Sequence, residues 1–174
     1  LAGLCDVVMQ YKPEFIVVLG DREDCLAAAT LGVYAQIPVI HLGGGDAADD
    51  GNSDNPVRDA VTKLSHLHLA TSHKSRDRLI CIGEEAWRCH VVGATGLDRL
   101  RKTPLVEPDD LWPRIGVNAP DGEYAVVIQH ALLPEHSCAA DQMTETLEAM
   151  RSVGISTFVS RPNSDPGSSL MHDI

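Results

Sequence analysis

Short apolar runs alternate with longer amphipathic stretches along this chain, and that alternation constrains its fold more than any other feature. Phe15 to Leu19 (FIVVL) is apolar throughout, and an Ala-rich stretch with helical spacing follows it from Asp24 to Gln36. Pro38 then opens a second apolar run, PVIHL. This order is typical of strand–helix–strand units around a parallel sheet. The sequence therefore predicts an α/β fold with a Rossmann-like parallel sheet.

The same rhythm continues along the rest of the chain. We predict further strands at Leu67 to Thr71, His90 to Gly93, Tyr124 to Gln129 and Ser156 to Ser160, and further helices at Pro56 to His66, Lys74 to Ile82 and Ser137 to Val153. Residues 102–122 carry four prolines without a strong apolar period, which predicts a linker with one helical turn near Leu111. The predicted domains are therefore 1–101 and 123–174.

Composition excludes some classes of partner. The chain has 174 residues, 44% of them hydrophobic, which is enough for a core, and its net charge of −11 disfavours nucleic acid and anionic membranes. The five cysteines show no C-x-x-C spacing and are predicted to be buried thiols in a reducing compartment. No run approaches the roughly 20 apolar residues that span a bilayer. We expect a cytoplasmic protein whose chain is incomplete at both ends.

Polar residues follow each predicted strand. In open parallel sheets ligands bind beyond the carboxyl ends of the strands, so these residues are the candidates for chemistry. Asp21 follows the first strand, at a place where partial burial can raise the pKa of a carboxyl group toward values useful for acid–base catalysis. Its neighbour Asp24 is better placed to cap the following helix, so Asp21 is interpreted as functional. The other candidates are Arg22, His41, the loop carboxylates Asp46, Asp49, Asp50 and Asp54, and, in the second domain, His130.

No metal or cofactor site is predicted. The loop carboxylates could bind a divalent cation or could simply be solvated surface charges. Their order departs from the EF-hand pattern D-x-[DN]-x-[DN]-G-x5-E, which disfavours calcium binding. His66 and His68 would share one face of a strand, as zinc ligands can, yet no third ligand stands at a suitable spacing, which favours a structural role. Neither G-x-G-x-x-G nor a P-loop pattern is present.

Five motifs in a fixed order resemble the UDP-N-acetylglucosamine 2-epimerases. They are GDRED, PVIHLGGGD, SDNPVRDAVTKLSHLH, VVGATGLDRL and VVIQH, within a resemblance that spans Pro13 to Gly167. The likeness is greatest to the hydrolysing branch used in sialic-acid and related nonulosonic-acid synthesis. It implies a glycosyltransferase-B-like pair of Rossmann-like domains that bind a UDP-sugar between them, and a homo-oligomer.

The resemblance also implies a reaction. In such enzymes UDP is eliminated across C1 and C2 of the sugar, and hydration of the resulting glycal releases N-acetylmannosamine. By position, the resemblance implies catalytic roles for Asp21, Asp54 and His130, with Asp46 as a further acid, and nucleotide-sugar contacts for Arg22, Arg58 and Asn163. The chain departs from the family pattern at Gly43, where many relatives carry Glu, at Asn55, where an acid is common, and at Ala131, where Pro is common.

Other functions stay open at this point. A non-hydrolysing 2-epimerase or a nucleotide-sugar glycosyltransferase would share the architecture. A receiver-like signalling module also presents an Asp after an apolar strand, but it needs an acidic pair after an earlier strand and a Lys after a later one, and neither is evident. The 174-residue chain by itself is expected to be inactive.

Overall fold

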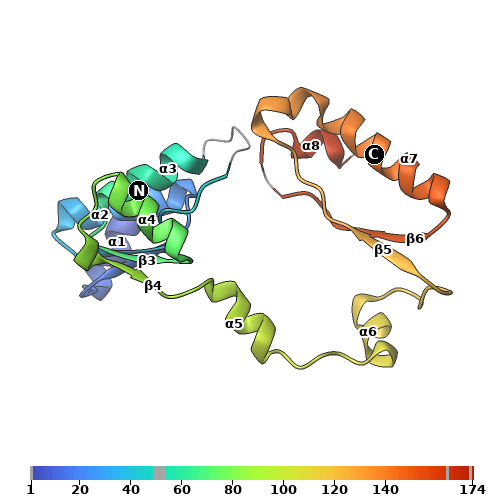
Figure 1. Cartoon of the computed structure of the whole chain (residues 1–174), viewed down its shortest axis with the longest axis horizontal. Coiled ribbons are helices and arrows are strands. Elements are labelled where there is room, and N and C mark those ends of the chain that lie inside the picture. The colour runs from blue at the N-terminus through green and yellow to red at the C-terminus, as the bar shows by residue number, and fades with distance from the viewer. Residues whose placement is uncertain (1, 49–53, 164, 173) are drawn as a thin grey trace. The chain divides into compact units, whose positions relative to one another are not determined.

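A computed structural model describes residues 2–48, 54–163, 165–172 and 174. The chain divides into two compact units (Figure 1). The first unit contains the described residues up to Thr103, and the second contains those from Pro104 onward. None of the described helices is long and apolar enough to cross a membrane.

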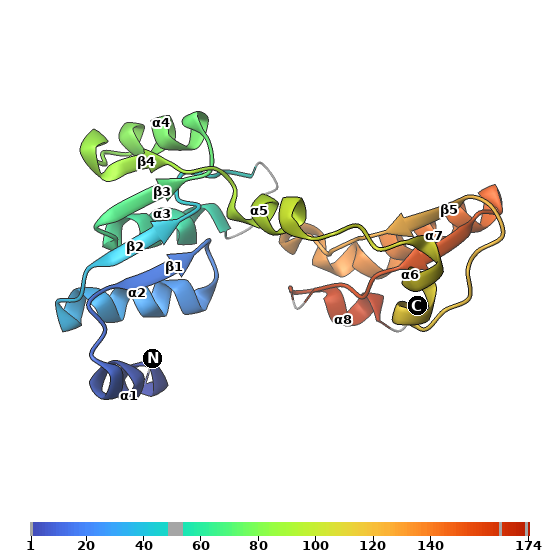
Figure 2. The ribbon, with the colours of Figure 1, turned by 90° about the horizontal axis from the view of Figure 1, so that it is seen from below.

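The first unit is built on a four-stranded parallel sheet (Figure 2). Its strands are β1 (Ile16–Leu19), β2 (Val39–Leu42), β3 (Leu67–Ala70) and β4 (Cys89–Val91), which lie side by side in chain order. The crossover helices are α2 (Glu23–Ala35), α3 (Asp54–Leu64) and α4 (His73–Cys81). Right-handed crossovers in this order place all three helices on one face of the sheet, above the strands in Figure 1. The four strands and three helices predicted for this region are confirmed within one or two residues.

One row of side chains across this sheet forms the buried centre of the unit. The parallel register aligns Val18, His41, His68 and Cys89, and all four are buried beneath the crossover helices. The two histidines are 0% exposed. On the opposite face, Val17 and Leu19 of β1 are 51% and 61% exposed. Only the helix-covered face of the sheet therefore carries the core.

Short elements complete the first unit. Helix α1 (Ala2–Tyr11) precedes β1, and the 3-10 turn η1 (Ala86–Arg88) precedes β4. Helix α5 (Thr95–Lys102) follows β4, where no helix was predicted. It buries none of its residues, although it is amphipathic in sequence.

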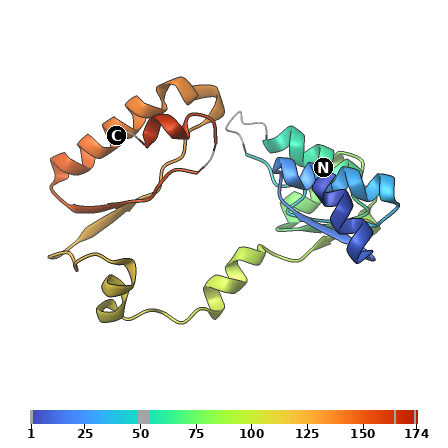
Figure 3. The same ribbon diagram turned by 180° about the vertical axis from the view of Figure 1, so that it is seen from behind.

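The second unit is a smaller parallel arrangement. Strands β5 (Tyr124–Val127) and β6 (Ser156–Val159) pair in parallel, and both were predicted. The connection contains η2 (Leu133–Cys138) and α7 (Ala139–Val153), and α8 (Ser168–Met171) lies on the same side of the strand pair as α7 (Figure 3). Ala131, Ala139, Met143 and Met171 form its buried core.

Helix α6 (Pro108–Ile115) lies in the stretch predicted as a linker. It has eight residues and so exceeds the single turn that the prolines suggested. Trp112 of α6 packs against the β5–β6 pair, with ring centroids 5.3 Å from Tyr124 and 5.5 Å from Phe158. These long-range ring contacts stabilise a segment whose own sequence shows no clear period.

Three sequence predictions are wrong in detail. Asp24 does not cap α2, because the N-cap residue is Arg22 and Asp24 lies inside the first turn. His66 precedes β3 and so does not share a strand face with His68; its Nδ1 accepts the Val39 N–H at 3.1 Å. All five cysteines are free thiols, but only Cys25 and Cys89 are buried, whereas Cys5 is partly buried and Cys81 and Cys138 are exposed.

Candidate functional site

Charged side chains gather where β1, β2 and β3 end. The Asp21 carboxylate, directly after β1, forms an ion pair with the Arg58 guanidinium from the first half of α3. Both side chains are largely buried, with 14% and 13% of their surfaces exposed. Asp46, from the loop after β2, and Arg78 of α4 lie beside them. We call Asp21, Asp46, Arg58 and Arg78 the carboxyl-edge cluster.

The Arg58 guanidinium joins several segments of the first unit. Besides Asp21, its Nη1 donates to the Asp46 carbonyl at 2.9 Å and to Asn55 Oδ1 at 3.4 Å. Its Nε is buried without a hydrogen-bond partner in the described part of the chain. Burial lowers the pKa of Arg58 below its ordinary value, the nearby Arg78 lowers it further, and Asp59 acts in the opposite direction. The Nη1 and Nη2 donors of Arg58, which was predicted as a substrate contact, therefore bind acceptors within the protein.

Asp46 is oriented by hydroxyl groups. The Thr71 and Ser75 hydroxyls both donate to its Oδ1, each at 2.6 Å. Its Oδ2 lies 3.9 Å from the point that a Cβ at Gly43 would occupy. The Asp46 carboxylate thus reaches the space next to the position where the family pattern has a Glu.

A pocket of about 280 Å³ opens beside Asp46. It is lined by Gly45, Asp46, Ala47, Thr71, Ser72, Lys74, Ser75 and Arg78. Arg78 is neutralised there by a two-pronged ion pair with Asp59, at 2.9 and 2.8 Å. Hydroxyl, carboxylate and ammonium groups together suit a polar ligand with both donors and acceptors.

His41 supports the same region from beneath. Its Nε2 lies 2.9 Å from the Gly20 carbonyl and its Nδ1 lies 3.1 Å from the Thr62 hydroxyl. A carbonyl only accepts, so we assign the ring proton to Nε2, and Thr62 then donates to Nδ1. Burial lowers the pKa of His41, while the Gly20 carbonyl and Asp46 act to raise it. His41 is therefore neutral, and its hydrogen bond fixes the carbonyl of Gly20, the residue before Asp21.

The remaining predicted residues of the first unit lie near this edge. Asp54 is the first residue of α3 and is half-buried, and Arg22 is the exposed N-cap of α2. Asp49 and Asp50 lie outside the described residues. Among the residues that are described, no group of three or more His, Cys, Asp or Glu side chains is arranged to hold a metal ion.

Two predicted residues of the second unit lie together. His130 is exposed at the end of the chain segment that follows β5, and its Nδ1 accepts the Asn163 N–H at 3.1 Å. The Asn163 side chain is fixed by Asp165 and Ser168, with its Nδ2 2.6 Å from Asp165 Oδ2 and its Oδ1 3.1 Å from Ser168 Oγ. That Asp21, Asp54 and His130 converge on one site stays a prediction.

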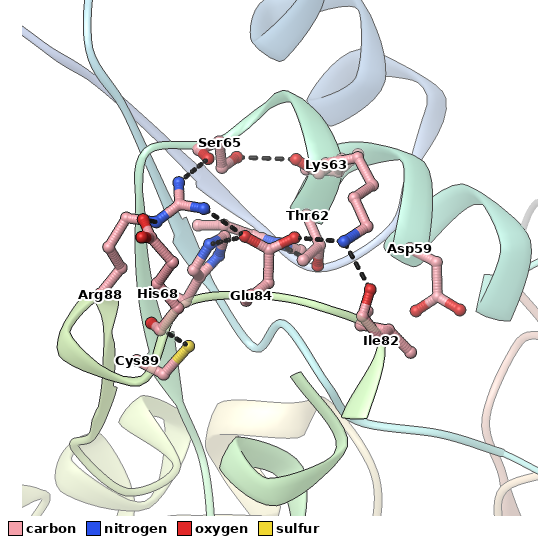
Figure 4. Close-up of polar contacts among 12 residues, drawn as sticks. Asp59, Thr62, Lys63, Ser65, His68, Ile82, Glu84, Arg88 and Cys89 are labelled. Carbon is pink, nitrogen blue, oxygen red and sulfur yellow. Dashed lines mark hydrogen bonds and ion pairs between the residues drawn. The ribbon is translucent and has the colours of Figure 1, made fainter. Parts of the chain in front are cut away.

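A second charged cluster was missed by the sequence analysis. Glu84 lies in the turn after α4 with 4% of its side chain exposed, and it is surrounded by Lys63, His68 and Arg88 (Figure 4). Its carboxylate accepts from Lys63 Nζ at 2.6 Å, His68 Nε2 at 3.1 Å and an Arg88 Nη at 2.8 Å. We call these four residues the Glu84 cluster. It lies near the amino-terminal ends of β3 and β4, whereas Asp21 lies beyond the carboxyl-terminal end of β1.

The neighbours of Glu84 stabilise its ionised form. Burial acts to raise the pKa of Glu84, but the Lys63 hydrogen bond and the charges of His68, Lys63 and Arg88 outweigh it and hold that pKa below its usual value. Burial lowers the pKa of His68, although Glu84 acts to raise it. The single signal in the sequence was Glu84 itself, an acid between an apolar helix end and a strand.

Comparison with known proteins identifies the family. The sequence model of the UDP-N-acetylglucosamine 2-epimerase family matches residues 1–174. The chain belongs to this family. A UDP-N,N'-diacetylbacillosamine 2-epimerase (hydrolyzing) of Legionella pneumophila subsp. pneumophila is 33% identical over 174 residues, which are 100% of this chain and 45% of the relative. A UDP-N-acetylglucosamine 2-epimerase of Neisseria meningitidis serogroup B is 26% identical over 158 residues, 91% of this chain and 41% of the relative.

Two solved structures confirm the fold class. The UDP-GlcNAc 2-epimerase from Neisseria meningitidis bound to UDP-GlcNAc matches with a TM-score of 0.75 at 20% identity, over 99% of this chain and 49% of that one. S. aureus MnaA with UDP matches with a TM-score of 0.76 at 17% identity, over 99% and 47%. The α/β, Rossmann-like, glycosyltransferase-B-like prediction is thereby confirmed. The chain spans about half the length of the epimerases that it matches.

Proposed function

We propose that this chain supplies acid–base residues of a hydrolysing UDP-N-acetylglucosamine 2-epimerase. The substrate is a UDP-sugar with an acetamido group at C2, and the products are UDP and N-acetylmannosamine. The observation that carries this proposal is the placement of Asp21 and Asp46 at the carboxyl ends of neighbouring strands, where Arg58 binds the Asp21 carboxylate and the backbone carbonyl of Asp46. Asp46 Oδ2 lies near the Cβ position of Gly43, so Asp46 supplies the acid that the family pattern has at 43.

The chemistry needs two kinds of group. A base removes the proton from C2, the C1–O bond to UDP breaks, and the electron pair of the C2–H bond becomes the C1=C2 bond of the glycal. Water then adds its oxygen to C1, and a proton is delivered to C2 on the opposite face. Positioned carboxylates are suited to the proton transfers, and a histidine is suited to protonating the departing phosphate oxygen. We assign the first role to Asp21 and Asp46, with Asp54 nearby, and the second to His130.

A second substrate is favoured by one observation. The 33% identical relative, matched along the whole chain, is a UDP-N,N'-diacetylbacillosamine 2-epimerase. Such a sugar keeps the C2 acetamido group and adds a second acetamido group. The same elimination and hydration would apply to it.

The test replaces the matched segment of the Legionella relative with this chain. The chimera is incubated with each UDP-sugar in deuterated water. The release of UDP and the incorporation of deuterium at C2 are then measured. We expect turnover, and we expect Asp21→Asn or Asp46→Asn to lower it by about 10²- to 10⁴-fold. Asp77→Asn, on the exposed surface of α4, is the matched control and should keep full turnover.

The outcomes separate the alternatives. A non-hydrolysing enzyme would give the C2 epimer still attached to UDP. A glycosyltransferase would release little UDP without an acceptor and would leave C2 undeuterated. A folded chimera that neither releases UDP nor incorporates deuterium at C2 would overturn the proposal.

A further inference from the structure

Helix α3 reaches the turn that carries Asp21 by two separate routes. Arg58 forms the ion pair with the Asp21 carboxylate. One helical turn further along, Thr62 bonds His41 at 3.1 Å, and His41 in turn bonds the Gly20 carbonyl at 2.9 Å. Residues four apart lie on the same face of a helix, so one face of α3 holds both the side chain of Asp21 and the backbone before it.

The surroundings of Arg58 favour an internal role for it. Its guanidinium is held by Asp21, by the Asp46 carbonyl and by Asn55, and only 13% of the side chain is exposed. A phosphate ligand needs a guanidinium edge that faces the bound nucleotide. Here the edges of Arg58 face the turn after β1 and the loop after β2.

We propose that Arg58 is the positioning residue that fixes the Asp21 carboxylate and ties it to the loop that carries Asp46. This inference rests on the proposed function only in treating Asp21 as the group that needs positioning. It assigns Arg58 a role different from the substrate contact that the family resemblance implies.

The planar fork of arginine matters to this role. Arg58 bonds a carboxylate and a carbonyl from two different loops at once, through Nη2 and Nη1. A lysine offers a compact ammonium group without that fixed geometry. Arg58→Lys should therefore keep the attraction for Asp21 but lose the link to the Asp46 carbonyl.

The first measurement uses the 174-residue chain and needs no activity. Carboxyl ¹³C NMR follows the titration of Asp21, whose resonance is assigned with Asp21→Asn. In Arg58→Gln we expect the midpoint of that titration to move upward by roughly one pH unit or more, because a neighbouring cation that favoured the ionised carboxylate is gone. Arg78→Gln is the matched control. Arg78 also bonds the Asp46 carbonyl, at 3.3 Å, but no bond joins it to Asp21 among the described contacts, so the Asp21 midpoint should move clearly less than in Arg58→Gln.

Two results would overturn the proposal. One is an unchanged Asp21 titration in a folded Arg58→Gln chain. The other is an equal shift in Arg78→Gln. If Arg58→Gln does not fold, the reciprocal experiment decides: in Asp21→Asn, exchange of the Arg58 guanidinium protons with water should accelerate at least about tenfold, and unchanged exchange would contradict the ion pair.

A second measurement separates positioning from substrate binding. In the Legionella chimera, Arg58→Gln should lower kcat at least about tenfold while KM for the UDP-sugar changes less than about threefold, since only the reacting geometry is lost. The acidic limb of the kcat profile should move to higher pH in the same variant. A rise in KM at constant kcat would instead make Arg58 a substrate contact. An inactive parent chimera would count against the proposed function alone, because the NMR titration stands without it.

Discussion

The two charged clusters of the first unit share one sheet but are built in opposite ways. In the Glu84 cluster, one deeply buried carboxylate receives three donors from three elements. In the carboxyl-edge cluster, two carboxylates and two arginines meet with partial exposure. In the described part of the chain, both clusters contain buried nitrogens without a hydrogen-bond partner: Arg58 Nε in the carboxyl-edge cluster, and His68 Nδ1 and Arg88 Nε in the Glu84 cluster. The first arrangement closes a structure, whereas the second leaves polar groups available beside a pocket. A carboxylate buried among its donors thus indicates a structural role, and charged groups beside a pocket at the strand ends indicate function.

The largest expected effect tests the structural side of this comparison. Glu84→Ala removes the buried carboxylate that accepts from Lys63, His68 and Arg88, and it leaves the buried His68 Nε2 without that acceptor. We expect it to lower the free energy of unfolding by about 3 to 5 kcal/mol, measured by urea denaturation.

Glu85→Ala is the control for that change. Glu85 is the next residue, with 66% of its side chain exposed and a 3.5 Å contact to Arg88. Its loss should cost less than about 1 kcal/mol. Equal losses for the two variants would break the distinction between the clusters.

The next effect concerns the glycine-rich loop of the carboxyl-edge cluster. Gly45 and Gly43 both have a positive φ, of 80° and 77°, so alanine is strained at either position. A Cβ at Gly45 would also collide with the Ser75 backbone, whereas at Gly43 the nearest atoms are 3.9 Å away. We expect Gly45→Ala to cost about 3 kcal/mol and Gly43→Ala about 1 kcal/mol in urea unfolding. Equal costs would show that the loop does not pack on α4 as described.

The third effect sharpens the comparison through pH. The pKa values of His41 and His68 are lowered by burial, so below about pH 6.5 the unfolded chain binds protons that the folded chain does not. Stability is therefore complete above that pH and falls as the pH drops, by at most about 1.4 kcal/mol per pH unit for each histidine. Urea unfolding between pH 7.5 and 5.5 measures this slope.

A matched pair of variants assigns that slope. His68→Gln should reduce it, while His90→Gln, at an exposed position of β4, should leave it unchanged. A slope that depends on His90 would contradict the assignment.

The smallest effect concerns the ion-pair partner of Arg78 in the carboxyl-edge cluster. Asp59 pairs with Arg78 through two contacts, but the two side chains are 33% and 29% exposed. Solvent screens such pairs, so Asp59→Asn should cost only about 0.5 to 1 kcal/mol. A loss as large as that of Glu84→Ala would mean that this pair behaves as a buried one.

The sequence predicted the fold well for a physical reason. Each strand of the first unit is a short apolar run followed by a helix, and this local pattern needs no knowledge of distant residues. Helix α6 was underestimated because its contacts, Trp112 with Tyr124 and Phe158, are distant in sequence. Helix α5 was missed, since its short, strongly charged sequence follows directly on a strand and a glycine turn.

The candidate site was predicted by position but not by pairing. Strand ends identified Asp21, Asp46 and His130 as polar residues, and the structure places them after β1, β2 and β5. Which of them pair is decided by side-chain reach across loops, and no spacing in the sequence indicates that Arg58 meets Asp21, 37 residues away. The Glu84 cluster was missed for the same reason, since Lys63 and Glu84 lie 21 residues apart.

The backbone of Gly43 limits how this lineage can change. At φ of 77°, the residue is in a conformation that side chains rarely adopt, and Asp46 Oδ2 already lies beside the place where one would point. A glutamate introduced at position 43 alone would meet both backbone strain and the repulsion of a second carboxylate. Exchanging Asp46 for a neutral residue at the same time would remove the repulsion, so the effects of changes at the two positions are expected to be coupled.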